Sequence, residues 1–471
     1  MAIRIYNTLS KKIEEFISAK AETVDIYSCG PTVYSFAHIG NFRTFLFNDL
    51  LRRYLKFCGF TVNHAMNITD VDDKTIAGAA AEGLSLQEYT SKYADIFFDD
   101  MRTLNIEPVE HTPRATDCIE DMLDIIKRLD EKGLVYTKDG SVYFNIAAWP
   151  KYGHLSNVDA SGIKTGLRYD TDEYEKEDVR DFALWKAPKD GEPAWDTPWG
   201  NGRPGWHIEC SAMIRRIFGS AIDIHTGGVD LIFPHHENEI AQSEAAFDEP
   251  FVRYWMHAEH LLVNGAKMSK SKGNFFTLRD LLSKGYSPRS IRYLLLSAHY
   301  RKQLNFTFDG LEQANQALLR IDNFLSAVND ICRKKTGGKA SAAVEDRITG
   351  LFTGFVDAMD DDLNISGGLG ALFEFLRDIN TMIASEAVTA ADGDSILAAL
   401  KRIDSVLGVI FFKPEADTKD EDASRIEALI AERAAAKLAK NFALADEIRD
   451  GLLQEGIVLE DSKDGTRWKK R

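Results

Sequence analysis

The stretch Asp25-Ile-Tyr-Ser-Cys-Gly-Pro-Thr-Val-Tyr-Ser-Phe-Ala-His38-Ile-Gly-Asn41 decides the fold of this chain. Residues 24–27 are typical of a short buried strand, and residues 42–57 carry apolar side chains at the spacing of an amphipathic helix. A polar loop therefore joins a strand to the N-terminus of a helix. In open parallel sheets, ligands bind beyond the carboxyl ends of the strands, and a helix N-terminus attracts anions. The stretch predicts an α/β fold with a ligand site at this loop.

Two residues of the loop suit a bound phosphate. Gly40 leaves room where a phosphate or a base has to come close, and His38 can donate a hydrogen bond. Alone, the sequence His-Ile-Gly-Asn also fits a tight turn with a structural histidine. A second stretch, Gly265-Ala-Lys-Met-Ser-Lys-Ser-Lys-Gly-Asn274, places lysines and hydroxyls between two glycines. Lys267 and Lys270 can supply positive charge to phosphates, although such a run by itself also fits a solvated basic loop.

Together, the two stretches resemble the two signatures of class I aminoacyl-tRNA synthetases. Four further segments make the chain similar to cysteinyl-tRNA synthetases, and the resemblance extends from the N-terminus to Trp468. These segments are Tyr27-Ser-Cys-Gly-Pro-Thr-Val-Tyr, Asn67-Ile-Thr-Asp-Val-Asp-Asp-Lys, Gly205-Trp-His-Ile-Glu-Cys-Ser and Gly227-Gly-Val-Asp-Leu-Ile-Phe-Pro-His-His-Glu-Asn-Glu. The resemblance implies a Rossmann-type nucleotide-binding core with a connective-peptide insertion, then an α-helical bundle and a small C-terminal α/β domain.

The composition is that of an ordinary globular protein. The chain has 471 residues, 44% of them hydrophobic and 28% charged. No apolar leader and no run long enough to span a membrane is seen, and five scattered cysteines indicate reduced thiols, so we expect a cytoplasmic protein without a membrane partner. The net charge of −16 disfavours nucleic-acid binding in general. Binding depends on local patches, however, and residues 466–471 are basic, although such a tail also fits a frayed terminus.

Sequence patterns and the resemblance divide the chain into domains. Residues 188–205 are rich in Pro, Gly and Trp, as expected near the end of an insertion, and four apolar stripes after residue 308 predict a helical bundle. Residues 413–422 are polar enough for a linker. The expected domains are 1–115 with 205–239 (Rossmann-type catalytic domain), 116–204 (connective-peptide insertion), 240–308 (stem-contact region with the lysine loop), 309–412 (helical bundle) and 423–471 (anticodon-binding domain).

One pair of residues has metal-ligand spacing. An apparent helix begins at Pro234, and on it His235 and Glu239 are four residues apart and share a face, whereas His236 points elsewhere. A His/carboxylate pair can bind a divalent metal, but it equally fits the capped start of a helix. Zinc takes four ligands, so two more would be needed.

Candidate sulfur ligands lie far from this pair in the sequence. Cys29 ends the first strand and Cys210 follows Gly205-Trp-His, but spacing alone does not bring them together, and each fits an inert buried thiol. The resemblance implies one Zn²⁺ per subunit, held by Cys29, Cys210, His235 and Glu239. His207 and His225 are either second neighbours of the zinc or ordinary core histidines. The remaining thiols, predicted to be packing residues, are Cys58, Cys118 and Cys332.

A zinc ion would solve a selection problem. Serine and cysteine differ by one atom, and shape alone separates such pairs poorly. Zinc binds a thiolate tightly and a neutral hydroxyl weakly. We therefore expect no editing site.

The resemblance implies a cysteine–tRNA ligase, which uses ATP with Mg²⁺ to convert L-cysteine to cysteinyl-adenylate and then charges the 3′ end of tRNA(Cys). The substrate carboxylate is the nucleophile, so positioning and electrostatic stabilisation carry the catalysis. A second histidine is usual where this chain has Asn41, which can donate a hydrogen bond but carries no charge. The implied residues are His38, Asn41, Lys267 and Lys270 for catalysis; His38, Gly40, Gly227, Gly228, Asp230 and Lys270 for ATP; Gly30, Thr69 and Trp206 for cysteine; and Arg433, Asp450 and Trp468 for the anticodon.

Several alternatives stay open at this point. A ligase joining cysteine to an aminosugar shares the catalytic motifs but has no anticodon domain of this kind. A non-catalytic tRNA-binding relative is disfavoured because the lysines and all four candidate ligands are present. Residues 69–74 are acidic and could hold Mg²⁺, although capping of the next helix is favoured. A monomer is the family expectation.

Overall fold

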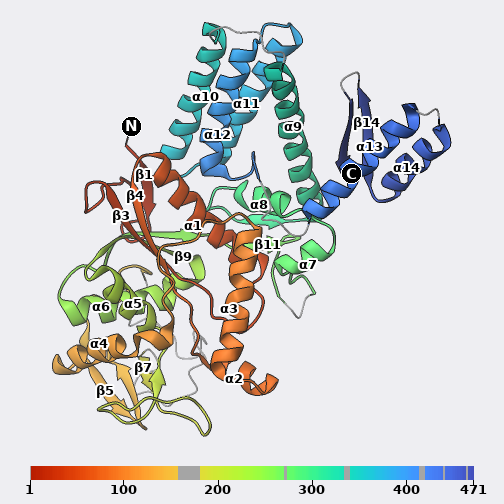
Figure 1. The fold of residues 1–471 in the computed structure, drawn as a ribbon. Coiled ribbons are helices and arrows are strands. Elements are labelled where there is room, and N and C mark those ends of the chain that lie inside the picture. Colours follow the sequence, from red (N-terminus) through yellow and green to blue (C-terminus); the bar gives the residue numbers. More distant parts are fainter. Residues whose placement is uncertain are drawn as a thin grey trace. The chain divides into compact units, whose positions relative to one another are not determined.

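The computed structural model describes residues 2–157, 181–269, 273–333, 340–412, 419–438, 441–462 and 465–470. The chain divides into two compact units, Met1–Phe412 and Lys413–Arg471. Figure 1 shows the elements of both units along the chain.

A parallel four-stranded sheet forms the centre of the first unit. Its strand order is β10 (Val252–Ala258), β9 (Ile222–Gly228), β3 (Thr23–Ser28) and β4 (Thr61–Met66), and all three pairings are parallel. The strand expected at residues 24–27 is confirmed as β3, and the expected helix is α1 (Ile39–Phe57), which begins three residues before the expected start. Because β4 and β9 flank β3 on opposite sides, the loop after β3 lies at the switch point of the sheet, where ligands bind in such folds.

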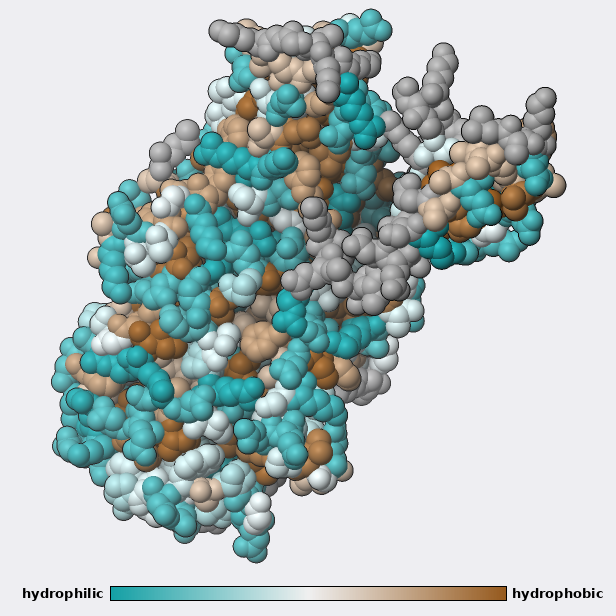
Figure 2. All heavy atoms as spheres, viewed as in Figure 1, coloured by the Kyte–Doolittle hydropathy of each residue, from teal (hydrophilic) through white to brown (hydrophobic). Residues whose placement is uncertain are grey.

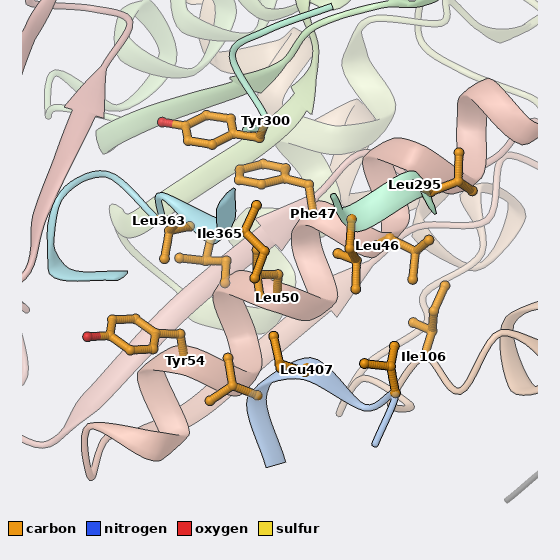
Figure 3. Close-up of a cluster of buried hydrophobic side chains, with 14 of the residues drawn as sticks. Leu46, Phe47, Leu50, Tyr54, Ile106, Leu295, Tyr300, Leu363, Ile365 and Leu407 are labelled. Carbon is orange, nitrogen blue, oxygen red and sulfur yellow. The ribbon is translucent and has the colours of Figure 1, made fainter. Parts of the chain in front are cut away.

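Helix α1 lies between one face of the sheet and helices that come later in the chain. Its buried side chains meet residues from α8 (Pro288–Leu296) and α12 (Ala390–Leu407) in one hydrophobic cluster (Figure 3). Phe47 stacks on Tyr300 with ring centroids 4.4 Å apart. The α1 helix is therefore shared by the nucleotide-binding core and the helical bundle.

A buried ion cluster strengthens this junction. Asp49 of α1 pairs with Arg53 at 2.8 Å and with Arg292 of α8 at 2.6 Å. Arg292 also donates to the carbonyls of Leu104 (3.0 Å) and Leu407 (3.0 Å). Burial disfavours the Asp49 carboxylate, but the two guanidinium groups outweigh it and lower the pKa of this group. Removing one partner of such a cluster leaves a buried charge, which costs about 3–5 kcal/mol.

The other face of the sheet is covered by a second cluster of buried hydrophobic residues. Three helices contribute to it, and an antiparallel sheet of four strands lies in the expected insertion region. These elements are α4 (Ile119–Glu131), α5 (Ile208–Phe218), α6 (Glu237–Phe247), β5 (Val135–Lys138), β6 (Ser141–Phe144), β7 (Phe182–Lys186) and β8 (Arg203–Pro204).

Four helices form the bundle predicted from the apolar stripes. They are α9 (Phe308–Arg333), α10 (Ala342–Asp360), α11 (Ile365–Ala384) and α12. The predicted stripes are buried except at Leu325, Ile348 and Met382, which are only partly buried. Pro288 occupies the first turn of α8, where a missing backbone N–H leaves no hydrogen bond unmade.

The first unit contains further helices and strands. They are β1 (Arg4–Asn7), β2 (Lys12–Glu15), α2 (Asp73–Glu82), α3 (Leu86–Thr103), β11 (Leu261–Val263), β12 (Ala266–Lys267), α7 (Leu278–Ser283) and β13 (Leu304–Phe306). Short helical turns lie at Ala115–Cys118, Ile146–Ala148, Val229–Leu231 and Ile232–His236.

The second unit is a helical hairpin with a two-stranded sheet. It contains α13 (Lys419–Leu438), α14 (Phe442–Gln454), β14 (Ile457–Ser462) and β15 (Gly465–Lys470). The two strands pair antiparallel with Leu459 opposite Trp468. The interpretation of the basic tail as a frayed terminus is therefore wrong for residues 466–470, and Arg471 lies outside the described residues. The sequence hid this strand because its charged residues lack the apolar alternation of a strand.

Polar side chains dominate the face of the protein that Figure 2 draws. Hydrophilic residues cover most of this face, and hydrophobic residues are exposed in smaller areas between them (Figure 2). None of the described helices combines the length and the apolar character that crossing a membrane requires.

Candidate active site

The two signature stretches lie side by side at the N-terminus of α1. His38 caps this helix: its Nδ1 accepts from the backbone N–H of Asn41 at 3.1 Å, and Oδ1 of Asn41 accepts from the N–H of His38 at 3.1 Å. The N–H of Ile39 donates to the carbonyl of Phe276, just after the lysine loop, at 3.0 Å. A Cβ added at Gly40 would lie 3.1 Å from Cε of Met268. The structure therefore joins two stretches that are more than 200 residues apart in the sequence.

The lysine loop is held by an asparagine. Oδ1 of Asn274 accepts from the N–H of Ser269 at 2.8 Å, and its Nδ2 donates to the carbonyl of Lys267 at 3.2 Å. The Lys267 side chain is exposed. Lys270 lies outside the described residues.

The end of β9 supplies the next candidate residues. A Cβ added at Gly227 would lie 2.6 Å from Cε1 of His236. Gly227 is thus required by the packing of a histidine, a reason that the sequence did not reveal. Gly228 ends the strand, and the Asp230 side chain is exposed beyond it.

The candidate cysteine pocket is built on a chain of hydrogen bonds. Oδ1 of Asn67 accepts from the N–H of Gly30 at 2.7 Å, and its Nδ2 donates to Oγ1 of Thr69 at 3.1 Å. The Thr69 hydroxyl donates to Oε2 of Glu209 at 2.7 Å, and both of these side chains are buried. Burial raises the pKa of Glu209 well above its ordinary value. Sequence reasoning missed Asn67 and Glu209 as partners of Thr69.

Trp206 lies beside one of the candidate metal ligands. Its ring stacks on His235 with centroids 4.2 Å apart and planes 19° from parallel. Because Thr69 bonds to the residue before Cys210 and Trp206 stacks on His235, both border the candidate metal ligands.

All four predicted metal ligands come together, and all are buried. Their ligand atoms lie within 4.8 Å of one another. His235 Nε2 is 2.7 Å from Oε1 of Glu239 and 3.6 Å from Sγ of Cys210. Sγ of Cys29 is 4.0 Å from Oε1 of Glu239. The chain thus brings the end of β3, helix α5 and the start of α6 to one point.

A second set of donors overlaps the first. Cys29, His225, His236 and Glu239 also lie within 4.8 Å of one another. His236 Nε2 is 3.2 Å from Sγ of Cys29, so the expectation that His236 points elsewhere is wrong. Helical spacing relates His236 only to residues of its own helix, whereas its partner Cys29 comes from the end of β3.

Further histidines surround both sets. His225 Nε2 lies 2.9 Å from Oε2 of Glu239, and His207 Nδ1 lies 3.0 Å from Nδ1 of His235. On the far side, His236 Nδ1 lies 2.8 Å from Nε2 of His257, a residue that sequence reasoning missed. Its place near the carboxyl end of a strand, where ligands bind in parallel sheets, is the signal that could have found it.

Charges in the cluster offset one another. Burial disfavours the Glu239 carboxylate, but His225 and His235 lower its pKa to about 2. Burial likewise disfavours the His235 cation, but Glu239 and Cys210 raise its pKa to about 10. A hydrogen bond from Cys29 to Cys210 favours the Cys210 thiolate over the penalty of burial and lowers its pKa to about 6. The cluster is therefore suited to a cation.

The other predicted residues are spread more widely. Asp72 caps α2 by accepting from the N–H of Lys74 at 2.9 Å, so the capping interpretation of the acidic loop is confirmed there. Cys118 is buried and Cys332 partly buried, whereas Cys58 is exposed, and its assignment to packing is wrong.

The three anticodon candidates lie in the second unit. Arg433 is only 6% exposed, whereas the Asp450 carboxylate is exposed and pairs with Arg449 at 2.9 Å. Trp468 is partly buried against the small core that includes Ile448 and Leu452.

Comparison with known protein families gives two matches. The family described as "tRNA synthetases class I (C) catalytic domain" matches residues 15–316, and the "DALR domain" matches residues 354–412. Among solved structures, the chain is similar to a Mycobacterium tuberculosis methionyl-tRNA synthetase in complex with methionyl-adenylate (TM-score 0.59, 16% identity, 83% of this chain and 89% of that one). It is also similar to the LeuRS of Agrobacterium radiobacter K84 in a ternary complex (TM-score 0.62, 11% identity, 84% and 85%). At these identities the likeness shows the fold.

Curated relatives match along their whole length. The chain is 52% identical to a cysteine–tRNA ligase of Solibacter usitatus over 471 residues, with all of both chains covered. It is 51% identical to a cysteine–tRNA ligase of Leptospira interrogans, with 100% of this chain and 99% of that one covered. The fold, the joined signatures and these matches lead to one assignment: the chain belongs to the cysteinyl-tRNA synthetases, a family of class I tRNA synthetases.

Proposed function

We propose that this chain is a cysteine–tRNA ligase that selects L-cysteine at a zinc site formed by Cys29, Cys210, His235 and Glu239. The observation that carries the proposal is the buried convergence of these four donors within 4.8 Å, beside the joined signature stretches. The relatives named above as cysteine–tRNA ligases support the reaction.

The donor set fits zinc. Two thiols, one imidazole and one carboxylate are ligands that Zn²⁺ accepts in a tetrahedral site. A bound zinc would favour a thiolate over a neutral hydroxyl and so separate cysteine from serine. Of the two overlapping sets, we prefer the one with two thiols, because His225 then remains free to bond to the second oxygen of Glu239 at 2.9 Å. Partners of this kind orient metal ligands.

Two side chains of the pocket would hold the rest of the amino acid. Thr69 offers a hydroxyl oxygen whose orientation is set by Asn67 and Glu209. Trp206 closes the pocket over His235. Gly30 lets the loop pack against Asn67, since a Cβ there would come within 1.8 Å of the Asn67 carbonyl oxygen. Together, these residues would orient the carboxylate toward the nucleotide.

The signature residues would act on ATP, which binds with Mg²⁺. The cysteine carboxylate oxygen attacks the α-phosphorus, the bond to the bridging oxygen breaks, and pyrophosphate leaves. His38, Asn41, Lys267 and Lys270 would stabilise the charge on the phosphates. Gly40 would let the nucleotide approach the backbone, Gly227 and Gly228 would line the adenosine site, and Asp230 suits the ribose hydroxyls.

The second step uses no further protein nucleophile. A terminal ribose hydroxyl of tRNA(Cys) attacks the activated carbonyl, and AMP leaves. We also propose the domain division given above, with residues 423–471 as the anticodon-binding domain, and a cytoplasmic monomer.

The deciding experiment is transfer of labelled cysteine to total cellular tRNA with ATP and Mg²⁺, with serine as the matched control. We expect charging with cysteine only, together with about one zinc per chain by elemental analysis. A folded, zinc-loaded protein that charges no tRNA would refute the ligase assignment. Equal charging with cysteine after complete removal of zinc would refute the role of the metal.

A further inference from the structure

Two aromatic side chains between β3 and α1 are exposed beside the active site and have no part in the chemistry above. Tyr34 is 36% exposed and Phe36 is 41% exposed. Among the described residues of the first unit, no other aromatic side chain belongs to the exposed large hydrophobic residues. Leaving a ring in water forgoes the stabilisation that burial gives, so this pair calls for an explanation.

The backbone around the two rings is held in place. The N–H of Val33 donates to the carbonyl of Thr69 at 3.2 Å, and the hydroxyl of Tyr89 donates to the carbonyl of Tyr34 at 2.6 Å. The Phe36 ring meets Tyr93 edge to face, with centroids 5.8 Å apart and planes at 81°. The rings are therefore presented on a supported loop.

A cation lies near each ring. Nζ of Lys74 is 5.2 Å from the ring centroid of Tyr34, and Cζ of Arg279 is 5.7 Å from that of Phe36. Arg279 also pairs with Asp100 at 3.0 Å, whereas Lys74 forms no ion pair with any residue in the described part of the chain. Aromatic faces combined with positive charge suit single-stranded nucleic acid, because bases stack on the rings and phosphates meet the cations.

We propose that Tyr34 and Phe36 form a stacking platform for the unpaired nucleotides at the 3′ end of the tRNA. The inference rests on the proposed function, since the second step brings a terminal ribose to the adenylate. The loop connects the substrate pocket at Thr69 with the capped helix start at His38, so nucleotides that cross it reach the reacting carbonyl. Stacking of this kind tolerates any base, and Lys74 would meet the backbone phosphate.

The test separates the two steps of the reaction. In the double variant Tyr34→Leu/Phe36→Leu, kcat/KM for tRNA in charging is expected to fall about 10- to 100-fold. Cysteine-dependent exchange of pyrophosphate into ATP is expected to stay within about twofold of the parent, since it needs no tRNA. Tyr34→Phe and Phe36→Tyr keep the rings and should keep charging. The control is Ile13→Ala, which removes an exposed hydrophobic residue from β2.

A second measurement uses binding alone. Trimming the unpaired 3′ nucleotides from the tRNA should weaken binding to the parent protein and leave binding to the double variant unchanged. The proposal is overturned if the variant loses exchange and charging equally, if its charging is unchanged, or if trimming weakens both proteins alike. If the parent protein performs pyrophosphate exchange and charging with cysteine, any of these outcomes disproves the platform alone. If the parent protein performs neither step, the proposed function itself is disproved.

Discussion

The candidate metal cluster and the signature loop lie at the same edge of one sheet but are built in opposite ways. All four donors of the cluster are buried, and their ligand atoms lie within 4.8 Å of one another. At the signature loop, Asn41 and Lys267 are exposed, and the polar groups of His38 and Asn41 are satisfied by capping α1. A site that separates sulfur from oxygen needs fixed distances without water. A site that handles phosphates needs accessible charge that the substrate itself can engage.

The strongest test of this contrast removes a thiol from the buried cluster. Cys210→Ala should abolish stoichiometric zinc binding and lower cysteine-dependent pyrophosphate exchange by more than about 100-fold, because even partners behind metal ligands contribute 10- to 100-fold. Zinc content by elemental analysis and the exchange rate check this. Cys118→Ala, a buried thiol outside the cluster, is the matched control. Full zinc content in Cys210→Ala would contradict the ligand assignment.

The next test changes Lys270 of the signature loop. Lys270→Ala should lower kcat of adenylate formation by about 100- to 1,000-fold, the usual effect of losing one group that stabilises a transition state. The KM for cysteine and the zinc content should stay close to those of the parent. Lys284→Ala, an exposed lysine nearby in the chain, is the control. A loss of zinc in Lys270→Ala would show that the two sites are not independent.

A smaller effect is expected at His225, which is not one of the four proposed ligands but bonds to one of them. His225→Gln removes the imidazole that bonds to Glu239 and should weaken zinc binding about 10- to 100-fold, with exchange activity recovering when zinc is added. Competition with a chelator measures the affinity. His154→Gln, an exposed histidine, should leave it unchanged. Unaltered affinity in His225→Gln would favour a purely packing role for this histidine.

The smallest effect concerns an ion pair on the α1 side of the sheet. Burial opposes ionisation of Glu110, but Arg52, which it binds through both oxygens at 2.6 Å, and the N–H of His64 lower its pKa to about 2. The unfolded carboxyl has a pKa of about 4.3. The pair therefore stabilises the fold fully above about pH 4.3 and loses its effect as the pH falls towards 2.

Urea unfolding of the parent and of Glu110→Gln should show this dependence. Because the carboxylate is partly exposed, we expect the free energy of unfolding of Glu110→Gln to be only about 1 kcal/mol below that of the parent from pH 7 to pH 5. This difference should narrow below about pH 4. A difference that widens on acidification would have the wrong sign and would exclude the ion pair as its cause.

Local patterns predicted much of the fold and only part of the site. Local sequence patterns predict the strand β3, the helix α1 and the shared face of His235 and Glu239. The structure confirms all three. Cys29 and Cys210 meet only because β3 and α5 pack together, which no spacing reveals.

Other contacts were hidden for related reasons. His236 lies 3.2 Å from Cys29, a partner that comes from another element of the fold. Glu209 reaches Thr69 across 140 positions of sequence. Such partners depend on tertiary packing, and a single sequence carries no periodic signal for them.

The buried cluster of Asp49, Arg53 and Arg292 has a mechanical consequence. Helix α1 begins at the cap of His38, and farther along it is tied by Asp49 to Arg292, which also holds the last turn of α12 through the carbonyl of Leu407. A fully buried ion pair does not yield to small forces. Because close-packed interiors transmit strain, we expect a displacement at this end of the bundle to reach the signature loop at His38 through α1.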